Sequence, residues 1–184
     1  MSFYYYLLVS FHIVIIFVFC YHILGTIHKP RKNPPTYWAK KISSSTLENL
    51  YQVNPYLFRS AEPTEKSFQE ISILGIKKII VLYPKKRQKY FFSGIEYYYF
   101  PMKSHKPNKE SIEKALFEIK KSLDNNIPTL VHCFHGADRT GLVIACHRIF
   151  HEHWKKEEAI AEMLEGGYGF HSLWSESINF IKKL

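Results

Sequence analysis

The hydrophobic positions of this chain fall into one long apolar stretch and a series of shorter runs. Between Phe3 and Ile27 there is no Asp, Glu, Lys or Arg. An α-helix rises about 1.5 Å per residue, so about 20 such residues would cross a hydrocarbon layer of roughly 30 Å. The stretch lacks the basic start and the small-residue cleavage site that mark a cleaved signal peptide. The pattern therefore predicts an uncleaved transmembrane anchor over residues 1–27, which makes the chain a single-pass membrane protein.

A basic segment that contains several prolines follows over residues 28–46. Pro30, Pro34 and Pro35 favour an extended backbone and cannot continue a helix, so we expect a linker. Its lysines and arginines come directly after the apolar stretch, and positive charge tends to remain on the cytoplasmic side of a membrane. This flank favours a cytoplasmic position for the rest of the chain.

From Leu47 onward, short apolar runs alternate with segments in which apolar residues recur every three or four positions. The run from Ile79 to Leu82 predicts a strand buried on both faces, and Asn108 is placed to cap a helix. We expect strands over residues 51–53, 56–59, 79–82, 95–100 and 128–131, and helices over 63–75, 108–123, from 142 onward, 156–164 and 173–184. This alternation predicts an α/β domain over residues 47–184, in which helices flank a central, mostly parallel sheet.

Charge and cysteine content narrow the possible functions. The formal net charge of +9 favours anionic partners, such as phosphorylated molecules, lipid headgroups or nucleic acid. No zinc finger, arginine-rich tract or RNA-binding aromatic signature supports nucleic acid. The three cysteines, Cys20, Cys133 and Cys146, have neither the spacing of a disulfide framework nor that of a zinc site. We therefore expect no metal and no cofactor.

The candidate chemistry lies in the stretch from His132 to Gly141, between a predicted strand and a predicted helix. A glycine-containing loop that leads into a helix N-terminus is an anion site, because its N–H groups and the helix dipole attract negative charge. Cys133 opens this loop, and Arg139 stands six residues later. Such surroundings lower the pKa of a thiol from about 8.5, and the thiolate can attack phosphorus. The motif predicts phosphomonoester hydrolysis through a phosphocysteine intermediate, with the guanidinium holding two phosphate oxygens.

Each remaining position of the loop has an expected role. Thr140 can donate its hydroxyl to the sulfur, and His132 is expected to orient the loop through a hydrogen bond. Gly136 allows the backbone to turn its N–H inward without a side chain in the way. The expected substrate-binding residues are Phe134, His135, Gly136, Ala137 and Arg139.

The motif His132-Cys133-x-x-Gly136-x-x-Arg139-Thr140-Gly141 resembles the signature of cysteine-dependent, dual-specificity-type protein tyrosine phosphatases. Residues 57–63 and 166–171 are similar to segments of bacterial members, and the resemblance covers residues 47–184. It implies the family's fold and metal-free hydrolysis of phosphotyrosine, or of phosphoserine and phosphothreonine, on proteins. It also implies that Cys133 is the nucleophile, Arg139 the phosphate clamp and Thr140 the helper of the thiolate. Some similar bacterial enzymes are exported, so the resemblance allows a periplasmic position and leaves the side of the membrane open.

The general acid is the part of the mechanism that the sequence leaves open. Family members commonly carry an Asp acid some tens of residues before the Cys, whereas the aspartates here are Asp124 and Asp138. Asp138 directly precedes the arginine, as in myotubularin-type lipid phosphatases, which leads to the hypothesis that it protonates the leaving oxygen. The alternative is that Asp138 braces the loop by binding backbone N–H groups or a neighbouring base. Glu110 and His105 are further candidates.

Two other functions remain open at this stage. The net charge, the predicted anchor and Asp138 are compatible with a phosphatase for phosphoinositides or inositol phosphates, although the loop contains no Lys. Arg59 and the basic run from Lys85 to Arg87 could attract a second anionic group, or could simply be solvated. The missing upstream Asp is compatible with a non-catalytic module that only binds phosphate.

Overall fold

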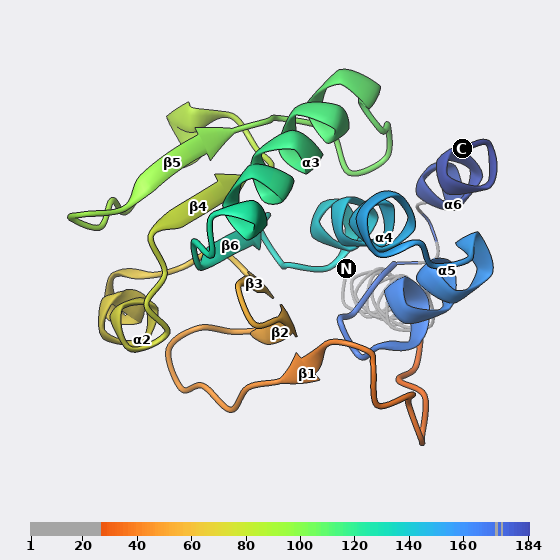
Figure 1. Ribbon diagram of the computed structural model, residues 1–184, viewed down its shortest axis with the longest axis horizontal. Helices are drawn as coiled ribbons and strands as arrows, with labels where there is room; N and C mark the ends of the chain where they lie inside the picture. Colours follow the sequence, from red (N-terminus) through yellow and green to blue (C-terminus); the bar gives the residue numbers. More distant parts are fainter. Residues whose placement is uncertain (1–26, 172, 174) are drawn as a thin grey trace, which may run out of the picture.

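A computed structural model describes residues 27–171, 173 and 175–184, which form a mixed α/β fold around one sheet (Figure 1). In the part of the chain so described, the sheet has the strand order β1-β2-β3-β6-β4-β5. The strands are β1 (Lys40–Lys41), β2 (Tyr51–Asn54), β3 (Leu57–Ser60), β4 (Lys78–Val81), β5 (Glu96–Tyr99) and β6 (Thr129–His132). Strands β3, β6, β4 and β5 are parallel to one another, whereas β1 and β2 run antiparallel to their neighbours. The expected α/β class and the mostly parallel sheet are confirmed.

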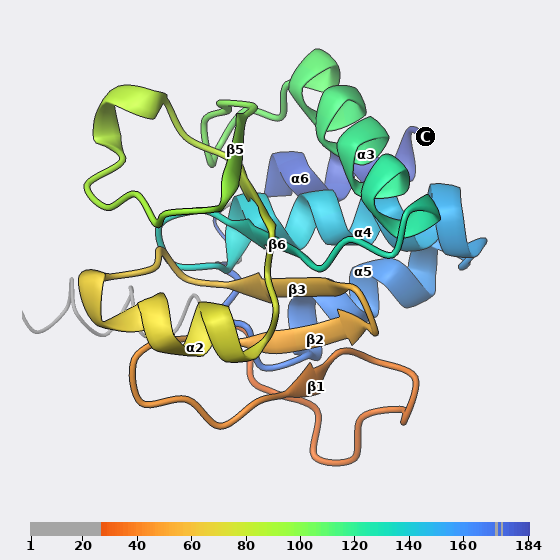
Figure 2. The same cartoon turned by 60° about the vertical axis from the view of Figure 1, so that its left-hand side comes forward.

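Helices cover both faces of this sheet (Figures 1 and 2). The helices are α2 (Phe68–Ile73), α3 (Lys109–Asp124), α4 (Asp138–Glu152), α5 (Lys156–Glu165) and α6 (Ser175–Lys182), with short 3₁₀ turns η1 (Glu65–Ser67) and η2 (Lys85–Arg87). Successive strand residues point to opposite faces, so Ile80 and Val131 pack against α3 to α6, whereas Ile79 and Leu130 pack on the side of α2. Both faces of the central strands are therefore buried.

Helix α4 is the centre of the larger helical layer. It packs against α3, α5 and α6, and its residues from Thr140 to Arg148 are all buried. The uniformly apolar run after the cysteine loop predicted this burial, because a helix surrounded by other elements needs no polar face. The loop that precedes α4 is thereby attached to the most enclosed helix of the domain.

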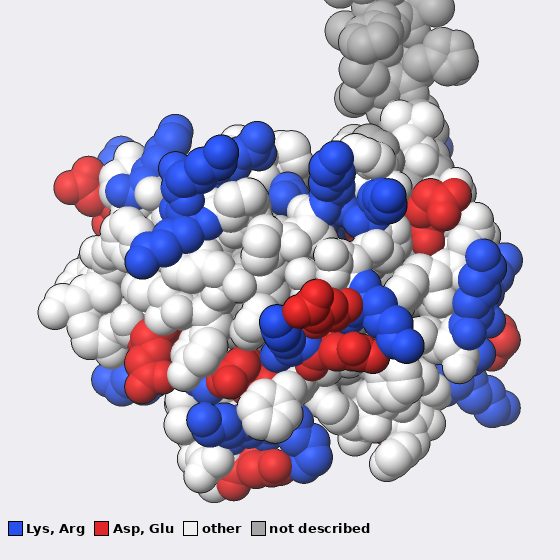
Figure 3. All heavy atoms as spheres, turned by 90° about the horizontal axis from the view of Figure 1, so that it is seen from above, with Lys and Arg blue, Asp and Glu red and all other residues white. Residues whose placement is uncertain are grey.

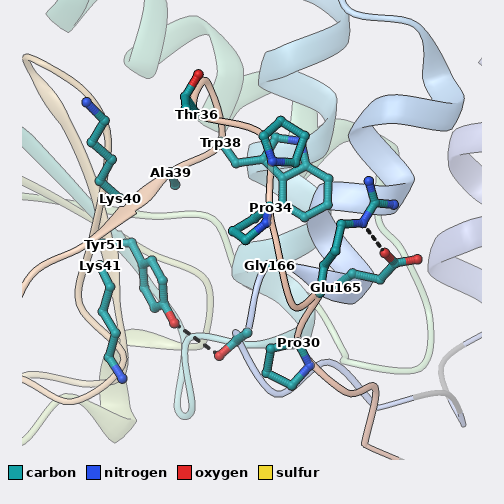
Figure 4. A pocket seen from close by; sticks show the side chains of 13 residues that line it. Pro30, Pro34, Thr36, Trp38, Ala39, Lys40, Lys41, Tyr51, Glu165 and Gly166 are labelled. Carbon is teal, nitrogen blue, oxygen red and sulfur yellow. Dashed lines mark hydrogen bonds and ion pairs between the residues drawn. The ribbon is translucent and has the colours of Figure 1, made fainter.

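Part of the segment that we expected to be a linker packs on the domain. Lys40 and Lys41 form β1 at the sheet edge, and Trp38 is buried under the Arg31 guanidinium, which lies 4.8 Å from its ring centroid. A pocket of about 610 Å³ lies beside them, and Figure 4 shows Trp38, Pro34 and Tyr51 around it. Hydropathy along the chain does not reveal such packing, because it also depends on distant residues: Arg31 binds Glu165 and Ala39 binds Glu162, 134 and 123 positions later.

The prediction of a transmembrane anchor, and of a single-pass membrane location, is wrong for the chain that the structure describes. No helix among residues 27–171, 173 and 175–184 has the length and apolarity that a membrane crossing needs. Helix α3 has 16 residues, about 24 Å at 1.5 Å per residue, and charged residues occupy its exposed side. A span of roughly 30 Å would need about 20 mostly apolar residues. The apolar stretch on which the prediction rested, residues 3–26, lies outside the described residues.

A buried ion pair joins α4 to α5. Arg148 donates to both carboxylate oxygens of Glu162 at 2.8 Å, and each side chain is only 2% exposed. The other oxygen contacts of Glu162 are the backbone N–H of Ala39 at 2.7 Å and the hydroxyl of Tyr168 at 3.3 Å. Such a pair contributes little over an apolar contact, but loss of one partner leaves an uncompensated charge in the core.

We therefore expect Glu162→Gln to destabilise the fold by about 3–5 kcal/mol. Urea denaturation followed by circular dichroism measures the change. Glu165→Gln is the matched control, because the Arg31–Glu165 pair is 2.6 Å long but about 40% exposed, and such pairs contribute about 0–1 kcal/mol. Equal losses in the two variants would contradict the buried network.

Two histidines make stability dependent on pH. Burial, and secondarily the neighbouring His147, lowers the pKa of His151 to about 4, while burial lowers the pKa of His132 to about 4 as well. Below about pH 6.5 the unfolded chain binds protons on these imidazoles and the folded chain does not. The free energy of unfolding therefore falls as pH drops from about 6.5 to about 4.

We expect His151→Gln to weaken this pH dependence, leaving the part due to His132. Urea unfolding midpoints of wild type and variant at about pH 7 and about pH 4.5 measure the effect. An identical acid shift in the two proteins would show that His151 does not contribute.

Candidate active site

The cysteine loop lies at the carboxyl edge of the parallel strands. Cys133 directly follows β6, and α4 begins at Asp138. Because β3 and β4 flank β6 in parallel, the ends of all three strands meet at this edge, which is where ligands bind in open α/β sheets. Cys133 is 2% exposed. The loop thus encloses the Cys133 sulfur at the carboxyl edge of the sheet.

Three successive carbonyl groups of this loop are bound by donors from outside it. The backbone N–H of Glu62 donates to Phe134 O at 3.0 Å, Asn49 Nδ2 to His135 O at 2.8 Å, and Arg59 Nη2 to Gly136 O at 2.7 Å. In a trans peptide the N–H of the next residue points opposite to the carbonyl. The N–H groups of residues 135–137 therefore turn toward the inside of the loop, as an anion site requires.

Gly136 allows the loop to approach β3. Its φ is +70°, and a Cβ at this position would lie 2.3 Å from the carbonyl oxygen of Ser60. That oxygen is backbone and cannot move aside without breaking β3. Only glycine fits between the loop and the strand.

Arg59 lies beneath the loop and is 1% exposed. Its guanidinium sits 3.6 Å from the ring centroid of Tyr168. Burial lowers the pKa of Arg59, and Tyr168, Glu162 and Cys133 oppose that shift, in this order. Arg59 is therefore a buried cation at the centre of the site. It is neither a solvated surface residue nor a surface group that attracts a second anion, which were the two alternatives from the sequence.

Arg139 and Thr140 carry donors that bind nothing else in the described protein. Arg139 Nε and Thr140 Oγ1 are buried, and each has no hydrogen-bond partner among residues 27–171, 173 and 175–184. Buried polar groups are nearly always satisfied, so an unpaired donor indicates a place for a ligand or a reacting group. Both lie in the first turn of α4, directly after the loop.

His132 connects the loop to the neighbouring strand. Its Nδ1 lies 3.1 Å from Cys133 O, and its ring packs edge-on against Tyr83 at 5.5 Å. Since a carbonyl only accepts, Nδ1 carries the proton and donates. With its pKa lowered to about 4 by burial, the imidazole is neutral near pH 7 and orients the loop.

Asp138 binds the C-terminal loop of the domain. The backbone N–H of His171 donates to Oδ1 at 2.9 Å, and Nδ1 of the same residue lies 3.0 Å from Oδ2 and 3.1 Å from Oδ1. These are contacts of the kind that the bracing alternative names, with a backbone N–H and with a neighbouring imidazole.

Two cavities meet at Arg139. One, of about 670 Å³, lies between Arg139 and the loop from Pro101 to Asn108, and includes Arg87. The other, of about 330 Å³, is lined by Glu62, Tyr83, Lys86, Arg87, Gln88, Lys89, Phe134 and Arg139. Lysines and arginines form much of both rims. Figure 3 shows how the charge is distributed on one face, with a group of basic side chains at the upper left and more acidic ones in the lower half.

Sequence reasoning missed the residues that hold the loop from a distance. Asn49, Glu62 and Tyr168 act through contacts across the fold, and Tyr83 donates to Glu62 Oε1 at 2.7 Å. Burial, and then the bond to Glu62, raises the pKa of Tyr83, so it keeps its proton. The only signal for this set was the resemblance of residues 57–63 and 166–171 to family segments.

Residues 46–168 match the model of the tyrosine phosphatase family, so this chain belongs to that family. A curated relative, the dual specificity protein phosphatase TpbA of Pseudomonas aeruginosa, is 30% identical over 133 residues, which is 72% of this chain and 60% of the relative. Another, an inositol diphosphatase of Oryza sativa subsp. japonica, is 32% identical over 108 residues, 54% of this chain and 53% of that protein. The chain thus spans a little over half the length of these relatives.

Solved structures agree with this assignment. The crystal structure of P. aeruginosa TpbA has a TM-score of 0.70 and 25% identity, covering 81% of this chain and 91% of that chain. The same protein with its cysteine replaced by serine, in complex with phosphotyrosine, has a TM-score of 0.68 and 25% identity over 82% and 90%. The predicted family is confirmed.

We expect Gly136→Ala to abolish tight binding of orthovanadate, a phosphate mimic, and to destabilise the fold by roughly 3 kcal/mol. Gly94→Ala is the matched control, because Gly94 has a φ of +75° but nothing within 4 Å of an added Cβ. It should lose only the 1–2 kcal/mol or so of left-handed strain and still bind. Calorimetric titration and urea denaturation measure the two quantities, and retained binding in Gly136→Ala would contradict the close approach.

Proposed function

We propose that this protein is a cysteine-dependent phosphatase that hydrolyses phosphotyrosine on proteins, and phosphoserine and phosphothreonine at the same site. The observation that carries the proposal is that three successive loop carbonyls accept hydrogen bonds from donors outside the loop. Because of these bonds, the N–H groups of residues 135–137 turn toward the inside of the loop that begins at Cys133. Family membership and the similarity to a dual specificity protein phosphatase support it.

In the first step, the Cys133 thiolate attacks phosphorus in line with the ester oxygen. The inward N–H groups and the Arg139 guanidinium bind the three non-bridging oxygens, whose charge they stabilise best in the transition state. The S–P bond forms as the P–O bond breaks, and the leaving oxygen takes up a proton. The buried Arg139 Nε, which has no partner among the described residues, becomes satisfied by the phosphate.

In the second step, water attacks the phosphocysteine, and the sulfur leaves as thiolate. The Thr140 hydroxyl, which lies in the first turn of α4 and has no partner among the described residues, donates to the departing sulfur in this proposal. Arg59 is a positioning residue: it holds the loop through Gly136 O and adds positive charge under the thiolate. His132 positions the loop from the strand side.

The surroundings of the loop suit an aromatic substrate. The Phe134 ring is 56% exposed and packs edge-on against His135 at 4.8 Å. Both residues border a cavity of about 620 Å³ that also includes Tyr90. Exposed rings beside a phosphate site can pack on a phosphotyrosine ring, which supports phosphotyrosine as a substrate.

Inositol phosphates are the second candidate substrate class. Arg87 lines both cavities that meet at Arg139, and Lys86, Lys89, Lys103 and Lys106 border them. Such a rim would bind phosphates beyond the one being cleaved, and the similarity to an inositol diphosphatase points the same way. The cysteine loop itself contains no lysine.

We expect wild type to release phosphate from a phosphotyrosine peptide faster than from an inositol diphosphate, and Cys133→Ser to lose roughly 10⁴-fold or more in rate. Malachite green assays of both substrates measure the rates. Cys146→Ser is the matched control: Cys146 is buried in the core, where burial raises its pKa to about 12, and its loss should leave the rate within a few-fold.

Faster release from the inositol diphosphate would favour the second candidate. No release from either substrate, with phosphotyrosine binding retained in Cys133→Ser, would instead indicate a non-catalytic phosphate-binding module.

A further inference from the structure

The side chains of both aspartates of this chain, Asp124 and Asp138, are engaged in contacts with other residues. Asp124 ends α3 and accepts from Lys120 Nζ at 2.7 and 2.9 Å. Helix α3 begins after β5 at the carboxyl edge of the sheet and runs back to the opposite edge, where β6 starts at Thr129. Both carboxylate oxygens of Asp138 contact His171. The residues that border the cavities at Arg139 are therefore the next candidates for the proton donor of the leaving oxygen.

The loop between β5 and α3 faces Arg139 across the 670 Å³ cavity. Within it, the Lys106 N–H donates to Lys103 O at 3.3 Å, which closes a turn with Ser104 and His105 at its tip. His105 is exposed and lines the cavity together with Arg139. The tip of this turn and the Arg139 side chain therefore border the same cavity.

Both ends of this loop are fixed to the domain. On one side Met102 is buried, and its N–H donates to Leu82 O at 3.3 Å. On the other, Asn108 caps α3 by accepting from Ser111 N–H at 2.9 Å, while the Ser111 hydroxyl donates to Pro101 O at 2.9 Å. A short turn anchored at both ends keeps its tip residue over the cavity.

We propose, as an inference that rests on the proposed phosphatase activity, that His105 is the general acid of this enzyme and replaces the aspartate common in the family. The cavity also holds Lys103, Lys106 and Arg87, whose positive charges attract a phosphate. An imidazole is the side chain that most often transfers protons in general acid–base catalysis.

Over one turnover, His105 gives one proton in the first step and takes one back in the second. As the Cys133 thiolate attacks, the P–O bond breaks and the His105 imidazolium gives its N–H proton to the leaving oxygen, so the product departs as an alcohol or phenol. The neutral imidazole then takes a proton from the water that attacks the phosphocysteine. The P–S bond breaks, phosphate leaves, and both thiolate and imidazolium are restored.

Glu62 is the competing donor. It lines the smaller cavity with Arg139 and Phe134, but its Oε1 already accepts from the Tyr83 hydroxyl at 2.7 Å. Glu62→Gln removes the carboxylic acid while keeping the shape of the side chain. It is therefore the matched comparison for His105→Gln, and Asp138→Asn tests the remaining carboxylate near the loop.

The experiment compares p-nitrophenyl phosphate, whose leaving group needs little protonation, with an alkyl phosphate, whose leaving group needs a proton. We expect His105→Gln to lose about 10²- to 10⁴-fold in kcat on the alkyl phosphate and less than about 10-fold on the aryl phosphate. It should also lose the basic limb of the kcat–pH profile. Glu62→Gln and Asp138→Asn should slow both substrates by the same factor.

His105→Asp is the rescue variant, because it restores an acid in the same turn. We expect it to recover most of the alkyl phosphate rate, with the basic limb moved to lower pH. Equal losses on the two substrates in His105→Gln, or a leaving-group dependence in Glu62→Gln instead, would overturn the assignment while leaving the phosphatase activity in place. Inactivity of wild type toward p-nitrophenyl phosphate would overturn the proposed function and this inference together.

Discussion

The hydrogen bonds that hold three loop carbonyls outward are the constraint on which this site depends. None of the donors belongs to the loop: they are Asn49 before β2, Arg59 on β3 and the backbone of Glu62 after β3. When successive N–H groups of a loop turn inward, the carbonyls turn outward, and each buried carbonyl then needs a donor from elsewhere in the fold. The pairing of β3 with β6 brings those donors to the cysteine loop, so the orientation of the loop's N–H groups depends on the order of the strands.

The buried cation at Arg59 extends this arrangement into the helical layer. Its desolvation is offset by the Tyr168 ring and by Gly136 O, and Tyr168 in turn contacts the Glu162 carboxylate that pairs with Arg148. A polar network therefore runs from the cysteine loop through the core to α4 and α5. Buried networks of this kind tolerate little rearrangement, because a lost partner leaves an unpaired charge in a low dielectric.

The basic rim acts on the substrate and on the general acid alike. Arg87, Lys103 and Lys106 border the cavity beside Arg139 and favour a dianionic phosphate. Cations beside an acid lower its pKa and a bound phosphate dianion raises it, and both effects act alike on a carboxylic acid and on an imidazolium. The inferred use of His105 therefore rests on its place in the turn that borders this cavity.

The sequence alone determined the place of the cysteine loop and the α/β class, because both depend on local order: a strand, a glycine turn and a buried helix in succession. Only the tertiary structure decided which residues the site's side chains contact. Asp138 looked equally suited to acid or brace until His171, 33 positions later, was found at its carboxylate. The burial of Arg59 and the packing of Trp38 likewise depend on distant segments. An apolar run predicted a membrane helix from hydropathy only, and no described helix has that character. The sequence specifies which side chains are present, whereas the tertiary fold determines which of them are in contact, because those contacts join residues far apart in the chain.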